Sequence, residues 1–302
     1  MTGHFRTPRS RATTVAALAL PTALLLTACG ADGEDAPAEE VEADEELADL
    51  VPEEFAESGV LRVGVNAEYP PGEYLDTDGQ TVVGFNVDLF DSAVAKLGLT
   101  NEWVPAEFEG IIVGVQSGEY DAGVSSFTVN AERMEEVHMV SYLTVGTQWF
   151  AQEGNPQGVD PESACGLAVA VEQHTVQHED LEERSEACVD AGEEPIDIQA
   201  HDSQEQATAT IQSGVNDAGL ADLPVAIYAM EQTDGEIELI GDMYEDAPYG
   251  AVVNHENTEL AEAIQAGYQA IMDDGTYEEI LTEWGATEGS LDTSELDPLV
   301  GE

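Results

Sequence analysis

The segment "QSGEYDAGVSS" at residues 116–126 recurs as "QSGVNDAGLAD" at residues 212–222. Each copy follows a helix-like run, turns at its first glycine and continues into a short apolar stretch typical of a buried parallel strand. A second pair of similar segments precedes the two copies, "LRVGVNAEY" at 61–69 and "LAVAVEQHT" at 167–175. Because both pairs occur in the same order, we predict an α/β fold of two similar lobes.

The segment that follows the first of these strands has a helical pattern. In "FNVDLFDSAVAKLG" at 85–98, Phe90, Ala93, Val94 and Leu97 fall on one helix face, and Gly98 is a stop signal. In open sheets built from such strands and helices, ligands bind beyond the carboxyl ends of the strands. We therefore expect two facing lobes to form one ligand-binding cleft.

Polar side chains follow the predicted strand ends of both lobes. The guanidinium of Arg133 matches a carboxylate, nearby hydroxyls add donors, and the carboxylate of Asp222 can accept from an ammonium group. The two sides together predict a site for a zwitterion. Tyr69 and Phe108 are candidates for the aromatic walls of this site, and the alternative is that they belong to the hydrophobic core. The other candidate ligand-binding residues are Asn66, Ser125, Ser126 and Thr128 in the first lobe, and Gln173, His174 and Thr175 in the second.

The chain of 302 residues has a formal net charge of −57, with 64 Asp and Glu against seven Lys and Arg. Only four basic residues follow position 28: Arg62, Lys96, Arg133 and Arg184. Such a charge excludes nucleic acid and anionic membrane surfaces as partners, because both would be repelled. Since the acidic residues are spread along the whole chain, we hypothesise a saline, halophilic habitat.

The N-terminus has the pattern of an export signal. Three arginines precede the apolar run "VAALALPTALLLTAC" at 15–29, which is too short to span a bilayer comfortably. The ending "LTAC" resembles the lipobox of bacterial lipoproteins, which implies removal of a signal peptide of residues 1–28 and lipidation of Cys29. The alternative is an ordinary secretory signal with an incidental cysteine. We predict an acidic, solvated tether over 29–57 and a similar acidic tail over 288–302.

Two cysteines, Cys165 and Cys188, remain after Cys29. In an oxidising compartment they are expected to form a disulfide, and the alternative is two free buried thiols. His174 and His178, four residues apart and followed by Glu182, are residue types that suit zinc or copper. The segment is polar and adjacent to a loop, however, so we favour exposed histidines and expect neither a metal nor a cofactor.

The ordered motifs of the chain resemble those of the family 3 extracellular solute-binding proteins, the amino-acid-capturing subunits of ABC importers. The resemblance covers about residues 58–287 and rests on "VLRVGVNAEYPP", "VVGFNVDLFDSAVAKLG", "FEGIIVGVQSGEYDAGVSSFTVNAER", "ADLPVAIYAM" and "DDGTYEEILTEWG". It implies a first lobe of residues 58–150 plus 248–287 and a second lobe of 151–247. The segments "GTQWFAQ" and "PYGAVVN" would be the hinge strands about which the lobes close on a ligand.

The resemblance also implies a role for each candidate residue. Arg133 would clamp an α-carboxylate with the help of Ser126 and Thr128, and Asp222 would take the α-ammonium. The sequence departs from the family pattern at two positions that would contact the ligand's side chain. Asn66 is neutral where many members have an acid, and "EQHT" at 172–175 is bulky where small residues are usual. The cysteine pair resembles a disulfide within the second lobe of lipid-anchored actinobacterial members.

We therefore expect a lipid-anchored, monomeric binding protein on the outer face of the cytoplasmic membrane, which delivers a polar amino acid or a derivative to ABC permease subunits. An enzyme is the first alternative, because the same fold resembles secreted dehydratases of aromatic biosynthesis. In that case Glu68, Glu172 or His174 would serve as acid or base. The second alternative is a sensor that passes its occupancy to a membrane kinase.

The hypothesis of a saline habitat predicts that the melting temperature rises with NaCl concentration. At 1 M salt the Debye length falls to about 3 Å, so that repulsion between surface carboxylates is screened. Thermal melts from 0.1 to 3 M NaCl, with a near-neutral protein of similar size as control, measure the effect. A melting temperature that does not rise with salt would contradict the hypothesis.

Overall fold

A computed structural model describes residues 41–299, and the signal peptide and Cys29 lie outside the described residues. Within 41–299, no helix is both long and apolar enough to cross a membrane. The helices are α1 Glu45–Ala48, α2 Glu53–Ser58, α3 Phe85–Lys96, α4 Phe108–Ser117, α5 Ala131–Glu136, α6 Val176–Ala191, α7 Gln204–Gln212, α8 Leu223–Gln232, α9 Thr258–Asp274 and α10 Thr276–Trp284, with short 3-10 turns η1 His255–Asn257 and η2 Thr287–Gly289. The strands are β1 Val60–Val65, β2 Glu68–Tyr69, β3 Glu73–Leu75, β4 Val82–Val83, β5 Thr100–Pro105, β6 Ala122–Gly123, β7 His138–Gln152, β8 Ala168–Glu172, β9 Asp197–His201, β10 Ala218–Asp222 and β11 Ile237–Val253.

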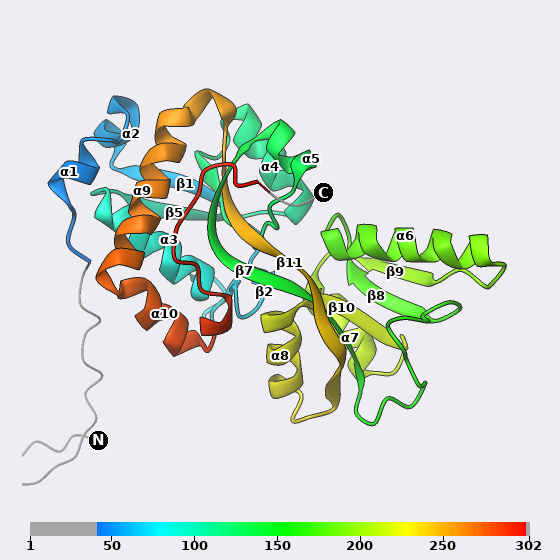
Figure 1. Ribbon diagram of the computed structural model, residues 1–302. Coiled ribbons are helices and arrows are strands. Elements are labelled where there is room, and N and C mark those ends of the chain that lie inside the picture. The colour runs from blue at the N-terminus through cyan, green and yellow to red at the C-terminus, as the bar shows by residue number, and fades with distance from the viewer. Residues whose placement is uncertain (1–40, 300–302) are drawn as a thin grey trace, which may run out of the picture. The chain divides into compact units, whose positions relative to one another are not determined.

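Eight of these strands form one sheet in the order β5-β1-β6-β11-β7-β10-β8-β9 (Figure 1). The first lobe contains the parallel strands β5, β1 and β6, and the second contains β10, β8 and β9. The long strands β7 and β11 pair in antiparallel fashion between them. The prediction of a two-lobed α/β fold with a two-strand connection is confirmed; the proposed hinge segment 146–152 lies within β7, and 248–254 lies within β11 except for its last residue.

The sequence repeat corresponds to the same structural unit in each lobe. In the first lobe β1 pairs in parallel with β6, so that Val63 lies opposite Ala122. In the second lobe β8 pairs in parallel with β10, so that Val169 lies opposite Ala218. The two pairs of similar segments are therefore two equivalent strand pairs, and their carboxyl ends carry the polar residues selected from the sequence.

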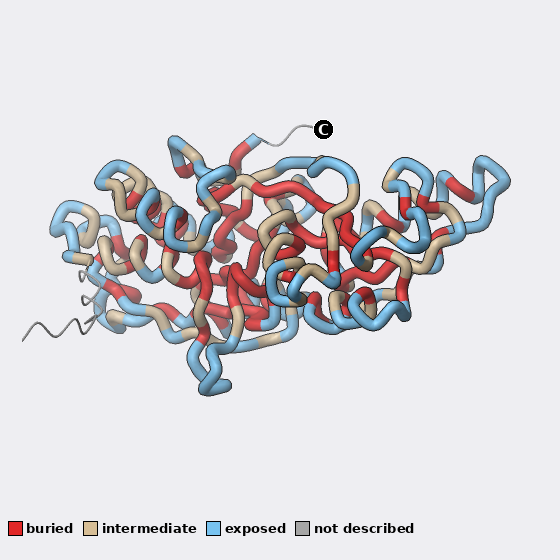
Figure 2. Tube along the Cα trace, turned by 90° about the horizontal axis from the view of Figure 1, so that it is seen from below, coloured by how far each residue is buried: buried red, intermediate tan, exposed pale blue. Residues whose placement is uncertain are grey.

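Helices pack against the sheet in each lobe, and the inner strands β6, β7, β8 and β10 are mostly buried, whereas the edge strands β5 and β9 are partly exposed (Figure 2). In the first lobe, α3, α9 and α10 share one apolar cluster, and α4 contributes to another. The predicted face of α3 is confirmed, because Phe90, Ala93, Val94 and Leu97 are all buried. In the second lobe, α6 contributes to one cluster, and α7 and α8 contribute to the other.

The segments expected to be a solvated tether and tail differ from that expectation within the described residues. Most of residues 41–50 are exposed, but Leu47 packs against the core of the first lobe and Val51 and Phe55 insert into it. Near the C-terminus Leu296 bridges to Val140, and the carboxylate of Asp297 accepts from the Met139 N–H at 2.8 Å. A few well-spaced apolar side chains are therefore enough to dock these acidic segments.

Cys165 and Cys188 form the predicted disulfide. The bond links the loop before β8 to α6 across 23 residues of sequence, beside the apolar cluster of the second lobe.

Replacing both cysteines by alanine should lower the free energy of unfolding by about 3 kcal/mol, because a loop of this length no longer restricts the unfolded chain. Urea unfolding with and without a reductant measures the effect. The reductant should destabilise the natural protein and leave the double variant unchanged. Equal stability of the two proteins without reductant would show that the bond contributes nothing.

Candidate functional site

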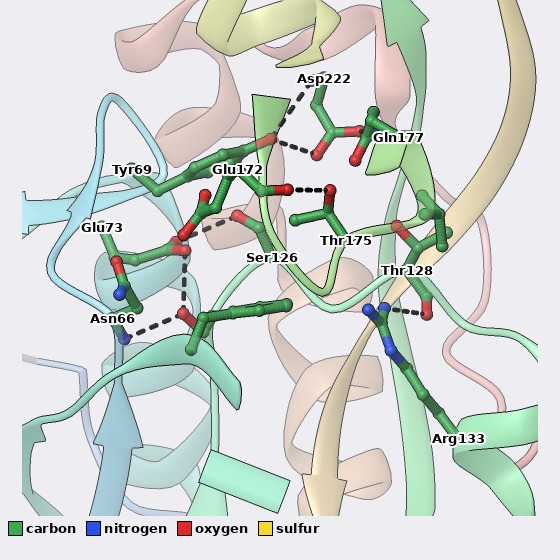
Figure 3. A pocket seen from close by; sticks show the side chains of 13 residues that line it. Asn66, Tyr69, Glu73, Ser126, Thr128, Arg133, Glu172, Thr175, Gln177 and Asp222 are labelled. Atoms are coloured by element: carbon green, nitrogen blue, oxygen red, sulfur yellow. Dashed lines mark hydrogen bonds between the residues drawn. The ribbon is translucent and has the colours of Figure 1, made fainter. Parts of the chain in front are cut away.

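A cavity between the lobes contains most of the residues selected from the sequence (Figure 3). The empty space between its walls, including space open to solvent, is about 310 Å³. Nine of the eleven candidates line it: Asn66, Tyr69, Phe108, Ser125, Ser126, Thr128, Arg133, Thr175 and Asp222. Its other lining residues, which the sequence analysis did not place in the ligand pocket, are Glu73, Glu172, Val176 and Gln177.

Asp222 ends β10 and is the N-cap of α8, and its side chain is buried. Its carboxylate accepts from the hydroxyls of Tyr69 at 2.8 Å and Tyr249 at 2.6 Å, and from the Gln177 amide at 3.0 Å. Burial raises the pKa of Asp222, and these three donors oppose that rise. Tyr69 was predicted as an aromatic wall, but it also packs into the second lobe and donates to Asp222 across the cleft.

Arg133 lies on the short helix α5, whose N-cap Asn130 accepts from the Arg133 N–H at 2.8 Å. Its guanidinium donates to the carbonyl of Thr128 at 2.8 Å and stacks over the rings of Phe108 and Phe127, 5.6 and 5.5 Å from their centroids. Burial lowers the pKa of Arg133. Phe108 thus both lines the cavity and supports the guanidinium.

Arg133 has no ion-pair partner in the described chain, unlike the other basic residues that the structure describes. Arg62, Lys96 and Arg184 each form an ion pair with an aspartate, at 3.0, 2.7 and 2.7 Å. Within residues 41–299, no carboxylate lies within ion-pairing distance of Arg133, although the chain is so rich in acids. The guanidinium that faces the cavity is therefore available to an anion from outside the chain.

A buried carboxyl group that the sequence analysis missed, Glu73 on β3, lies on the first-lobe side of the cavity. It accepts from the Asn86 amide at 2.6 Å and from the hydroxyls of Ser126 at 3.2 Å and Ser125 at 3.4 Å. Burial raises the pKa of Glu73 to about 8. The serine hydroxyls, predicted as donors to a ligand carboxylate, donate to this acid instead, while Asn66 binds Ser125 through its backbone N–H at 3.0 Å.

Gln173 and His174 were predicted in the pocket, but they do not line the cavity. The Gln173 amide donates to Asp202 at 2.9 Å, and the ring of His174 pairs with Glu109 of the first lobe at 2.8 Å. His174 has a positive φ of 63°, which turns its side chain outward while its carbonyl accepts from Arg133 at 3.4 Å. The loop therefore contributes backbone and Thr175, the N-cap of α6, rather than the two bulky side chains.

The family model "Bacterial extracellular solute-binding proteins, family 3" matches residues 61–287. The chain is 37% identical to the arginine-binding protein ArgT of Corynebacterium glutamicum, over 82% of this chain and 81% of ArgT. A solved ancestral arginine-binding protein bound to arginine is 30% identical, with a TM-score of 0.69 over 75% of this chain and 98% of that one. An ancestral amino acid-binding protein, AncCDT-1, a precursor of cyclohexadienyl dehydratase, is 26% identical, with a TM-score of 0.69 over 76% and 97%.

The buried acid Glu73 predicts a pH dependence of stability. In the unfolded chain its carboxyl ionises near its ordinary pKa of 4.5, whereas in the folded protein the pKa is about 8. Its contribution to stability is therefore fully present below pH 4.5 and is lost as the pH rises through 8. Glu73→Gln should reduce this loss by on the order of 2 kcal/mol.

Urea unfolding of the ligand-free protein at pH 4.5, 6 and 8.5 measures this contribution. Glu68→Gln, which removes an exposed acid from the adjacent strand β2, is the matched control. Identical pH profiles for Glu73→Gln and the natural protein would contradict the assignment.

Proposed function

The chain belongs to family 3 of the bacterial extracellular solute-binding proteins, and from that membership we propose that it captures an amino acid between its lobes for an ABC permease. The pairing of charges carries the proposal. Arg133 of the first lobe is without an ionic partner in the described chain, and the carboxylate of Asp222 lies across the same cavity. An α-carboxylate fits the guanidinium, and an α-ammonium fits the carboxylate.

We further propose that the ligand has a basic side chain. The cavity holds three carboxyl groups, those of Glu73, Glu172 and Asp222, and one guanidinium. Once Arg133 and Asp222 are assigned to the two ends of the amino acid backbone, acidic groups remain for the side chain. The neutral amide of Asn66 then leaves no acid missing from the pocket, because Glu73 of β3 supplies one. The arginine-binding name of the relative ArgT agrees with this choice.

Capture requires that the ligand favours the closed arrangement of the lobes. Tyr69 of the first lobe already contacts Asp222 of the second in the described structure, at 2.8 Å. A ligand that binds Arg133 on one side and Asp222 on the other makes both contacts only when the lobes are closed, and this difference shifts the equilibrium. The lobe boundaries proposed for this motion are residues 58–150 plus 248–287 for the first lobe, and 151–247 for the second.

The proposal includes export, a lipid tether at Cys29 and a monomeric protein that presents its closed form to the permease. Binding without turnover is favoured over the dehydratase alternative, although a solved relative is a dehydratase precursor. Of the three candidate acids or bases, Glu172 lines the cavity, whereas Glu68 does not and His174 has its side chain against Glu109. The Arg133 and Asp222 pair requires no reaction to explain it.

Replacing Arg133 by alanine should weaken arginine binding by about 3 kcal/mol, or about a hundredfold in Kd, because the ligand carboxylate would be buried without its partner. Titration calorimetry at high salt measures the change. Arg62→Ala is the matched control, since it removes an exposed, already paired guanidinium from the same lobe. A Kd within threefold of the natural value in Arg133→Ala would refute the carboxylate clamp.

A further inference from the structure

The carboxyl group of Glu172 has no role in the clamp described above. Glu172 is the last residue of β8, lines the cavity and is only 3% exposed. Within the described chain no side-chain or backbone group donates a hydrogen bond to its carboxyl oxygens, whereas Glu73 and Asp222 each have three donors. A buried carboxyl group without a partner is costly, which indicates a partner that the chain itself does not supply.

Glu172 and Glu73 approach one another from opposite lobes. Figure 3 shows their side chains pointing toward the same part of the cavity, on the far side of Tyr69 from Asp222. Burial and then repulsion from Glu73 raise the pKa of Glu172 well above its usual range, and Glu68, Asp222 and Glu107 add to the repulsion. Repulsion between two carboxyl groups that face the same part of the cavity opposes ionisation of both, and a cation beside them would relieve it.

We propose that Glu172 and Glu73 form a subsite for the cationic end of the ligand side chain, closed from both lobes, in which the cation replaces a proton held by the two acids. The inference rests on the proposed capture of an amino acid. The charges balance, because one positive charge enters with the ligand while one proton leaves to the solvent, so that both carboxylates are ionised around the cation. A guanidinium suits this subsite best, since its planar fork can donate to both carboxyl groups at once.

The subsite adds selectivity for the ligand's side chain, which the clamp lacks. Arg133 and Asp222 bind groups common to all amino acids, so they do not distinguish one side chain from another. Glu73 lies on the first lobe and Glu172 on the second. A cationic side chain between them would therefore bridge the cleft, as the amino acid backbone does between Arg133 and Asp222. Both ends of the ligand then favour closure, and a neutral side chain of the same shape would bind only at one end.

The test compares arginine with citrulline, its neutral isostere, by titration calorimetry on the mature protein in phosphate and in Tris. The dependence of the heat on the buffer gives the number of protons released. We expect at least one proton released per arginine and none per citrulline. Arginine affinity should rise from pH 6 to 8, and citrulline affinity should stay level.

Glu172→Gln tests the residue itself. It should weaken arginine binding at least about tenfold, leave citrulline within about twofold and release fewer protons than the natural protein. Glu172→Asp, which keeps the acid, should recover part of the discrimination between the two ligands. Glu186→Gln, which removes an exposed acid of α6 that does not line the cavity, is the control and should change neither the ratio of arginine to citrulline affinity nor the number of protons released. Thermal melts establish that each variant is folded.

The outcomes separate the two proposals. An unchanged ratio of arginine to citrulline affinity in folded Glu172→Gln, or arginine binding without proton release, would overturn the subsite. So would a natural protein that binds neutral amino acids and not arginine, although capture of an amino acid would then stand. A natural protein that binds no amino acid would overturn both.

Discussion

The carboxylate of Asp222 is where three parts of the chain meet. Gln177 reaches it from the second lobe, Tyr249 from the long strand β11, and Tyr69 from the first lobe. A buried carboxylate must be hydrogen-bonded, so the position of each donor is constrained by the same two oxygen atoms. The relation between the lobes and the connecting strands therefore depends on this one group, and the cavity beside it takes its shape from these contacts.

The fold could be predicted from the sequence, and the two residues of the proposed clamp could be selected from it, because both leave a local pattern. The repeat at 116–126 and 212–222 marks equivalent strands, and parallel strands bring their carboxyl ends to one edge. Arg133 is conspicuous because the chain has so few cations. Asp222 was found because it occupies, in the second copy, the position of Ser126 in the first.

The two acids of the proposed side-chain subsite left no such pattern. Glu73 and Glu172 are two among 64 acidic residues, and nothing in the local sequence distinguishes a buried carboxyl group from a solvated one. Their burial results from contacts between segments far apart in the chain, such as that of Glu73 with Asn86 and Ser126. The docked segments around Phe55 and Leu296 were missed for a related reason, because composition was weighed above the spacing of single apolar residues.

The path of the chain has a practical consequence for following this protein in solution. The chain enters the second lobe through β7 and leaves it through β11, and the segment around Leu296 returns to the first lobe beside β7. A pair of fluorophores, one on exposed Val113 of α4 and one on exposed Val215 beyond α7, would therefore sit on different lobes. Energy transfer between them would follow the separation of the lobes directly, without touching the cavity, and would turn the protein into a reporter of its own occupancy.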